Sequence, residues 1–155
     1  MSLTTIRANI ITQLEAVTPS IGNIYDFKRH VTTWEKYFSE FSKSGKIQAW
    51  EVTRTALDHG VEAVQDLAGT EALFFDRHFF TIFGYVSVDD VAESEKDFQD
   101  TIELIRIRFR QNNLLGGTVV RHSDLQVATI DHLSFGGVLV HYTEMTLETE
   151  ERVGG

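Results

Sequence analysis

The sequence of 155 residues contains no cysteine and only one proline, and its 14 basic residues are outnumbered by 23 acidic ones. Without cysteine, the chain can have no disulfide, no thiol nucleophile and no thiolate metal site. A free-standing nucleic-acid binder normally carries a basic stripe, and the net charge of −9 disfavours that class. No stretch approaches the roughly 20 apolar residues that cross a bilayer. We also expect no signal peptide, because the N-terminus lacks a basic start and a long apolar core.

Apolar residues make up 42% of the chain and charged residues 24%, which are ordinary fractions for a soluble globular protein. We therefore expect residues 1–155 to form a single domain with a substantial core, and the absence of cysteine fits a reducing cytosol. The acidic residues concentrate at 89–100 and 144–151. Such runs usually form a solvated surface, and the alternative is an acidic face that lines a passage or meets a basic partner.

Residues 79–111 form the best-specified unit of the sequence. The run 79–88 is apolar at both alternating sets of positions, which predicts a strand that is central in a sheet and covered on both faces. Asp89 and Asp90 end this run and supply N-cap chemistry, and a helix is expected from there to about Gln111. The apolar stripe of that helix is Phe98, Ile102, Ile105 and Phe109. The unit contains no catalytic signature.

The remaining elements follow from the same periodicities. Helices are expected at 4–17 and 32–43, and strands at 21–28, 46–55, 124–132 and 138–149. Residues 58–72 are polar and do not alternate, so we expect a long loop there that is mobile until a partner orders it. From about residue 148, we expect a fraying acidic tail.

These elements predict an α+β fold: a mostly antiparallel sheet with two long helices packed on one face, plus a short aromatic helix as an insertion. The strand at 79–88 is apolar on both faces, whereas the two long helices cover only one. Its second face needs another cover, which is either the aromatic helix or a neighbouring subunit. The interface candidates under the second alternative are Trp34, Phe38, Trp50, Phe79, Phe83 and Tyr85.

A search for chemistry finds no established motif. The six histidines form no HExxH pair, and the sequence has no GxSxG, P-loop or GxGxxG pattern. Asp76 and His78 share one face of a strand. His132 and His141 can face each other across the final hairpin, so a metal or acid–base site assembled in space is the alternative. Ordinary polar strand positions explain these residues more simply, and we expect no enzyme and no catalytic, cofactor-binding or metal-binding residues.

Four passages in order carry a resemblance to a known family. They are the N-terminal helix with Ile6 to Val17, TTWEKYFSEFSKSGKIQAWEVTR at 32–54, RHFFTIFGYVSVDDVAESEKDFQDTIELIRIRF at 77–109, and LQVATIDHLSFGGVLVHYTEMTLETEE at 125–151. Together they span nearly the whole chain, and none is a catalytic fingerprint. The chain resembles the tail-terminator and tail-completion proteins of long-tailed bacteriophages, including those of prophages and gene-transfer agents.

The resemblance implies a structural virion protein without enzymatic activity or cofactor. Such proteins form rings, often hexamers, that cap the tail tube and dock to the head connector or neck protein, and DNA passes through the channel without specific binding. The ring is assembled in the host cytoplasm and resides in the virion. An acidic lumen would let DNA slide. The candidate channel-lining residues are Glu144, Glu148, Glu150 and Glu151, or else Glu93, Glu95 and Asp97.

Two alternatives remain at this point. A head-side neck or head-completion protein belongs to the same class, and genomic neighbours would separate it from a tail terminator. A small α+β ligand-binding domain or enzyme belongs to a different class. It would be recognised as a monomer with a deep pocket lined by converging His, Asp and Glu residues.

Overall fold

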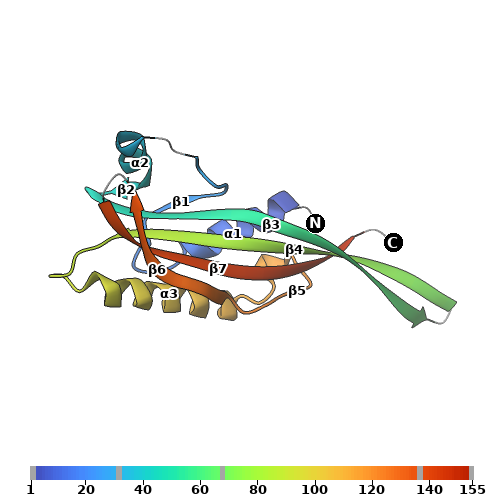
Figure 1. The fold of residues 1–155 in the computed structure, drawn as a ribbon. Coiled ribbons are helices and arrows are strands. Elements are labelled where there is room, and N and C mark those ends of the chain that lie inside the picture. The colour runs from blue at the N-terminus through green and yellow to red at the C-terminus, as the bar shows by residue number, and fades with distance from the viewer. Residues whose placement is uncertain (1–2, 31–32, 67–68, 136–137, 154–155) are drawn as a thin grey trace.

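The computed structural model describes residues 3–30, 33–66, 69–135 and 138–153 (Figure 1). Its helices are α1 (Leu3–Glu15), α2 (Trp34–Phe41) and α3 (Ser94–Gln111), with a short 3-10 helix, η1 (Leu115–Gly117). Its strands are β1 (Asn23–Tyr25), β2 (Ser42–Lys43), β3 (Lys46–Asp66), β4 (Gly69–Ser87), β5 (Arg121–His122), β6 (Gln126–Phe135) and β7 (Val138–Val153).

The described strands form one curled sheet organised around β3, β4 and β7. β4 lies between β3 and β7 and pairs antiparallel with both. β5 and β6 pair with successive parts of β7, and β2 pairs antiparallel with the start of β3. β1 pairs with β3 in parallel, with Ile24 opposite Trp50. The sheet is therefore mixed.

The expected arrangement, a mostly antiparallel sheet with two long helices on one face, is wrong. The described chain has three helices distributed over both faces of a mixed sheet, and the architecture is α+β-like. The sequence periodicity missed the parallel pairing of β1 with β3. Parallel neighbours need a crossover connection, and the segment from β1 through α2 to β3 supplies it.

The larger core lies between the sheet and the helices α1 and α3. Trp50 of β3, Phe80 of β4 and Leu147 of β7 face the helices. Ile6, Ile10 and Leu14 of α1 enter the same core, as do Phe98, Ile102, Ile105 and Phe109 of α3. The predicted stripe of α3 is thus buried. The helix begins later than the predicted caps Asp89 and Asp90, because its N-cap residue is Glu93. The Asp89 carboxylate accepts a hydrogen bond from the backbone N–H of Ala92, in the turn before the helix.

A smaller core covers part of the opposite face. Tyr37 and Phe41 of α2 stack on each other at 4.8 Å between ring centroids and pack with Tyr85 of β4. Phe83 and Val140 belong to the same cluster. α2 is shorter than expected because residues 42–43 turn into β2. The aromatic helix therefore covers this end of the second face within one chain.

The segment 58–72, expected to be a loop, is instead the far part of a long hairpin. β3 and β4 pair in continuous register from His59 opposite Asp76 to Asp66 opposite Gly69, and residues 67–68 lie outside the described residues. This hairpin projects beyond the helices, and we call residues 56–66 and 69–78 the arm (Figure 1). The outer part of the arm extends beyond the helices, so its strands do not need the apolar alternation by which strands are recognised. The expected acidic tail is also wrong, because β7 continues to Val153.

Candidate functional site

The core-facing side of the sheet continues onto the arm, where its outer residues are exposed although His78 at the base is buried. Val61 and Val153 both lie opposite Phe74, and Leu57 lies opposite His78, so all these side chains share the face that carries Phe80 further along β4. The exposed fractions are 66% for Val61, 46% for Phe74 and 41% for Leu57. A shallow groove on this face is lined by His59, Gly60, Val61, Phe74, Phe75, Asp76 and Val153. We call Leu57, Val61, Phe74 and Val153 the arm stripe.

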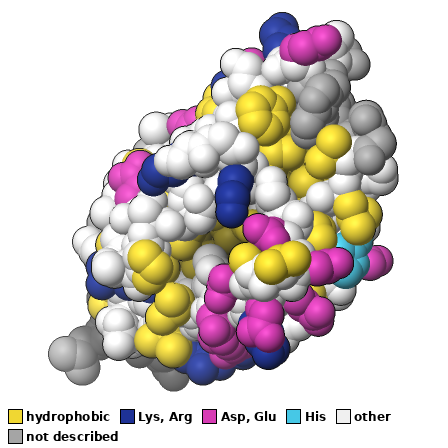
Figure 2. Space-filling model, turned by 90° about the vertical axis from the view of Figure 1, so that its left-hand side faces the viewer, with side chains coloured by type: hydrophobic (Ala, Val, Ile, Leu, Met, Phe, Trp, Pro, Cys, Tyr) yellow, Lys and Arg dark blue, Asp and Glu magenta, His cyan; other side chains and the backbone are white. Residues whose placement is uncertain are grey.

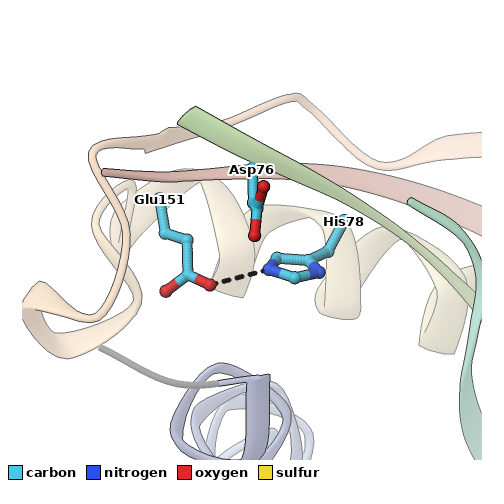
Figure 3. Close-up of side chains that lie close together, drawn as sticks. All are labelled: Asp76, His78 and Glu151. Atoms are coloured by element: carbon cyan, nitrogen blue, oxygen red, sulfur yellow. Dashed lines mark hydrogen bonds and ion pairs between the residues drawn. The ribbon is translucent and has the colours of Figure 1, made fainter. Parts of the chain in front are cut away.

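A polar cluster interrupts the arm stripe on the same face, between Leu57 and Val61 at the base of the arm. His59 of β3, Asp76 of β4 and Glu151 of β7 lie opposite one another across three strands. His78 lies two residues along β4. Its Nε2 is 2.9 Å from Glu151 Oε1, while His59 Nδ1 is 2.6 Å from Asp76 Oδ1. Figure 3 shows Asp76, His78 and Glu151 pointing toward one another. We call these four residues the arm-base cluster.

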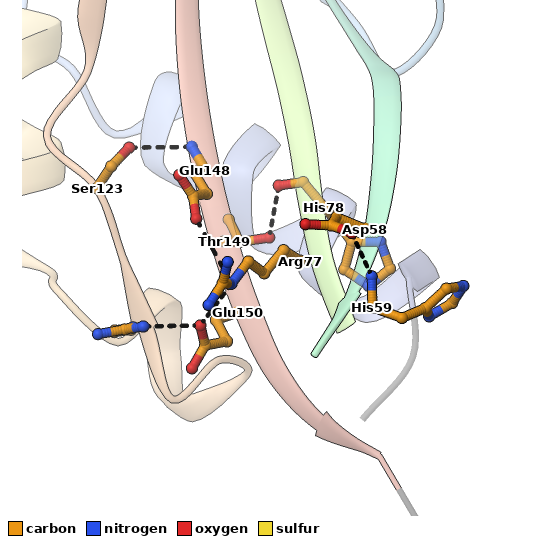
Figure 4. A network of polar contacts seen from close by, with 9 residues as sticks. Asp58, His59, Arg77, His78, Ser123, Glu148, Thr149 and Glu150 are labelled. Carbon is orange, nitrogen blue, oxygen red and sulfur yellow. Dashed lines mark hydrogen bonds and ion pairs between the residues drawn. The ribbon is translucent and has the colours of Figure 1, made fainter. Parts of the chain in front are cut away.

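The opposite face of the arm base carries an ion-pair network (Figure 4). Arg77 Nε lies 3.1 Å from Glu150 Oε2, and Arg121 Nη2 lies 2.9 Å from the same oxygen. Burial alone would raise the pKa of Glu150, but the hydrogen bonds from Arg121 and Arg77 outweigh it and hold that pKa below its usual value. Arg77 also approaches Glu148 at 3.9 Å. This network ties β5 to β7 and β4.

The predicted interface aromatics fall into separate environments. Trp50 is fully buried in the core beneath α1 and α3, so it is not a surface residue of the subunit. Phe83 and Tyr85 are buried beside α2, and the Lys28 ammonium lies 3.9 Å from the centre of the Phe83 ring. Phe79 is half-buried and Phe38 is exposed. The side chain of Trp34 lies outside what the structure describes.

The acidic channel candidates also divide. Glu150 and Glu151 are buried, Glu150 beside Arg77 and Arg121 and Glu151 beside His78, so neither side chain is exposed to a channel in this conformation. Glu144 accepts a hydrogen bond from the Tyr142 hydroxyl and, like Glu148, is half-buried. The alternative candidates Glu93, Glu95 and Asp97 are all exposed. They belong to an acidic surface where α3 begins, at the end of the molecule opposite the arm (Figures 1 and 2).

A buried serine–histidine pair joins α3 to β7. Ser94 Oγ lies 2.8 Å from His141 Nε2, and the same oxygen accepts a hydrogen bond from the backbone N–H of Asp89. Burial, together with the nearby His132, lowers the pKa of His141. The rings of His132 and His141 lie 5.0 Å apart, as the final hairpin predicts. The pair resembles an activated nucleophile only in composition, because both side chains are buried.

Sequence reasoning identified Asp76 and His78 as residues on one face but missed His59 and Glu151 as their neighbours. Only the pairing register reveals them, because His59 lies in the supposed loop and Glu151 in the supposed tail. The converging carboxylates and imidazoles could hold a cation or move a proton. Among the described pockets, the one with most His and Glu residues is an open depression of about 230 Å³ lined by Arg121, His122, Ser123, Glu148 and Glu150. It does not include His78.

Comparison with known proteins adds no relative: no protein-family model matches the chain, and no curated protein matches it. Among the described helices, none combines the length and the apolar character needed to cross a membrane.

Proposed function

We propose that the chain is a structural virion protein that assembles into a closed ring, and that this ring caps the tail tube of a long-tailed bacteriophage. The observation that carries the proposal is the uncovered arm stripe. Leu57, Val61 and Phe74 continue the core-facing side of the sheet beyond the helices, at the exposed fractions given above. Apolar side chains gathered on a projecting element are typical of a surface that another protein covers.

A second copy of the chain is the partner that best fits this surface. Beyond Glu51, the outer edge of β3 has no strand partner among the described residues, and the outer edge of β6 has none either. Open edges invite pairing with another chain. The arm lies at one end of the molecule, and in the proposed ring it meets a different surface on its neighbour. Such head-to-tail contacts close into rings when the rotation permits it.

The charge of the chain supports a passage for DNA. Six copies would carry a charge on the order of −50 if each contributed its net −9. An acidic lumen repels phosphates, whereas a basic one would retain DNA through counterion release. The exposed acids at the start of α3 are the better candidates for this surface, because Glu150 and Glu151 are buried within the subunit.

Under the same proposal, the partners are the tail-tube protein below the ring and the head connector or neck protein above it. A head-side neck protein would use an arm in the same way, and it is distinguished by which of these two partners it binds. The chain's oligomeric state, alone and with tail-tube protein, tests the proposal, because a ring subunit must associate in at least one of these conditions.

A small enzyme is the second candidate, and the arm-base cluster is the observation that favours it. Its Asp76, His78 and Glu151 converge from two strands. However, His78 and Glu151 are buried, and the described pockets do not provide a deep cavity beside them. Turnover lost on substitution of His78, in a protein that remains monomeric, would replace the structural proposal with this one.

A further inference from the structure

The arm-base cluster has the composition and spacing of a metal site. Asp76, His78 and Glu151 offer one ligand atom each, and these atoms lie within 4.8 Å of one another. The three residues occupy one face of adjacent strands, because Asp76 lies directly opposite Glu151 and His78 is two residues from Asp76. The backbone therefore fixes the ligands before any ion binds, which lowers the cost of forming a site.

Glu151 has a buried carboxylate oxygen whose hydrogen-bonding capacity is not met by the described part of the subunit. Its side chain is buried, with 4% of the residue exposed, and only Oε1 is hydrogen-bonded, to His78 Nε2. Its second oxygen, Oε2, is buried and has no hydrogen-bond partner among the described residues. A buried carboxylate oxygen without a partner is costly and points to a missing ion or water. Asp76 lies opposite Glu151 in register, but in Figure 3 the unpartnered oxygen is on the side of the carboxylate away from Asp76 and His78. The carboxylate must therefore rotate to bring Oε2 to an ion shared with Asp76.

We propose that Asp76, His78 and Glu151 bind a divalent transition-metal ion of the zinc class, with His59 as the fourth ligand. His59 Nδ1 lies 2.6 Å from Asp76 Oδ1, but His59 is outside the group whose ligand atoms lie within 4.8 Å of one another. Its exposed imidazole must therefore turn inward to reach an ion held by Asp76. Imidazole nitrogens with carboxylate oxygens suit zinc, whereas calcium and magnesium prefer oxygen alone. The two carboxylates balance the charge of the dication.

The geometry also provides an entry path. His78 and Glu151 form the buried side of the cluster, while Asp76 is partly exposed and the His59 side chain is 73% exposed. An ion would enter from the His59 side and take the place of the proton between His78 Nε2 and Glu151, and the imidazole proton would then be carried on Nδ1. Because the ligands come from β3, β4 and β7, the bound ion would fasten the arm to the body of the sheet at the point where it leaves.

Arg54 sets a specific condition on this site. Its Nη1 lies 3.3 Å from His78 Nδ1, which suits a donor facing an unprotonated nitrogen. An ion on Nε2 requires the imidazole proton on Nδ1, where it would face the guanidinium, so Arg54 must turn aside. A glutamine at this position could accept a hydrogen bond from that Nδ1–H through its amide oxygen, and it would remove one repelling positive charge. Arg54→Gln should therefore tighten metal binding.

The test is calorimetric titration of the full chain with Zn²⁺ after removal of metals with a chelator. One ion per chain is expected to bind. Asp76→Asn and His59→Ala should each weaken binding by about tenfold or more, and Arg54→Gln should strengthen it. His30→Ala is the matched control, since it removes an exposed imidazole outside the cluster and should leave the affinity unchanged. Co²⁺ in place of Zn²⁺ should give the visible absorption of a four-coordinate site.

Two results would overturn the proposal. One is the absence of stoichiometric Zn²⁺ binding to the folded wild-type chain. The other is binding that His30→Ala weakens as much as His59→Ala does, which would indicate adventitious surface histidines. His59 and Asp76 are the primary positions because both reach the surface, so their substitution leaves the buried core unchanged. Neither outcome depends on ring formation, so the metal-site proposal is tested independently of the proposed function.

Discussion

The indole ring of Trp50 lies directly against Gly84, its cross-strand partner in β4. A Cβ atom added to Gly84 would lie 2.3 Å from Trp50 Cζ3, and the indole Nε1 donates a hydrogen bond of 2.8 Å to the carbonyl oxygen of Ile21. The ring is held from two sides, with Phe98 of α3 stacked nearby at 6.2 Å. This explains the single glycine within the apolar run 79–88, and it makes Trp50 a core residue of the subunit.

The first prediction concerns this contact. Gly84→Ala should lower the free energy of unfolding by about 1–3 kcal/mol, because the added methyl group has no space beneath the indole ring. Urea denaturation followed by tryptophan fluorescence measures the change. Gly60→Ala is the control in β3: its Cβ would lie 3.9 Å from the Phe75 Cβ, an ordinary contact, so it should change stability little. Equal effects of the two substitutions would refute the close packing.

The second prediction concerns the arm stripe. Val61→Asp should weaken subunit association by about tenfold or more, because it places a charge in the apolar surface that a neighbour would bury. The stability of the isolated subunit should change little, since Val61 is 66% exposed. Val91→Asp is the matched control, as Val91 is 97% exposed before α3. Analytical ultracentrifugation compares them, and an unchanged association of the Val61 variant would exclude the stripe from the interface.

The third prediction concerns pH. Burial and the neighbouring His132 lower the pKa of His141 below its ordinary value of 6.5, while Glu95 and Asp90 oppose the shift. The unfolded chain then binds more protons than the folded one, so stability falls as pH drops below about 6.5 toward the lowered folded pKa. Above that range this loss is absent.

Unfolding measured in urea between about pH 8 and pH 5 tests this dependence. His141→Gln keeps a group near the position of Nε2 but does not titrate, so its stability should decline less over this range than that of the wild type. The carboxyl groups with lowered pKa, Asp124 and Glu150, contribute at lower pH, below about 4.5. An identical decline in both proteins would remove His141 as the cause.

The fourth prediction concerns the acidic surface at the start of α3. Replacing Glu95 and Asp97 with lysine should leave ring formation intact and slow DNA ejection, and the defect should ease as salt screens the added charges. Reversing Glu144 and Glu148 on β7 is the comparison, since these residues are half-buried. If neither pair alters ejection, the acidic-lumen proposal fails, although a ring could still form.

The sequence predicted those helices and strands that pack one face against the core, because their apolar residues then recur at regular spacing. α3 follows from the spacing of Phe98, Ile102, Ile105 and Phe109, and all four are buried. The arm could not be predicted, because the polar residues His59 and Asp76 interrupt the apolar positions on its one partly apolar face. The parallel pairing of β1 depends on a crossover that leaves no periodic signal. The arm-base cluster depends on register between distant strands, so Asp76 and His78 were recognisable while His59 and Glu151 were not.

The measurement that tests the central claim most directly is the mass of the purified chain in solution, alone and with tail-tube protein. Native mass spectrometry over a wide concentration range provides it. The account predicts a closed ring, most commonly of six subunits, in at least one of the two conditions, and its loss in the Val61→Asp variant. A chain that stays strictly monomeric at every concentration, both alone and with tail-tube protein, would contradict the account.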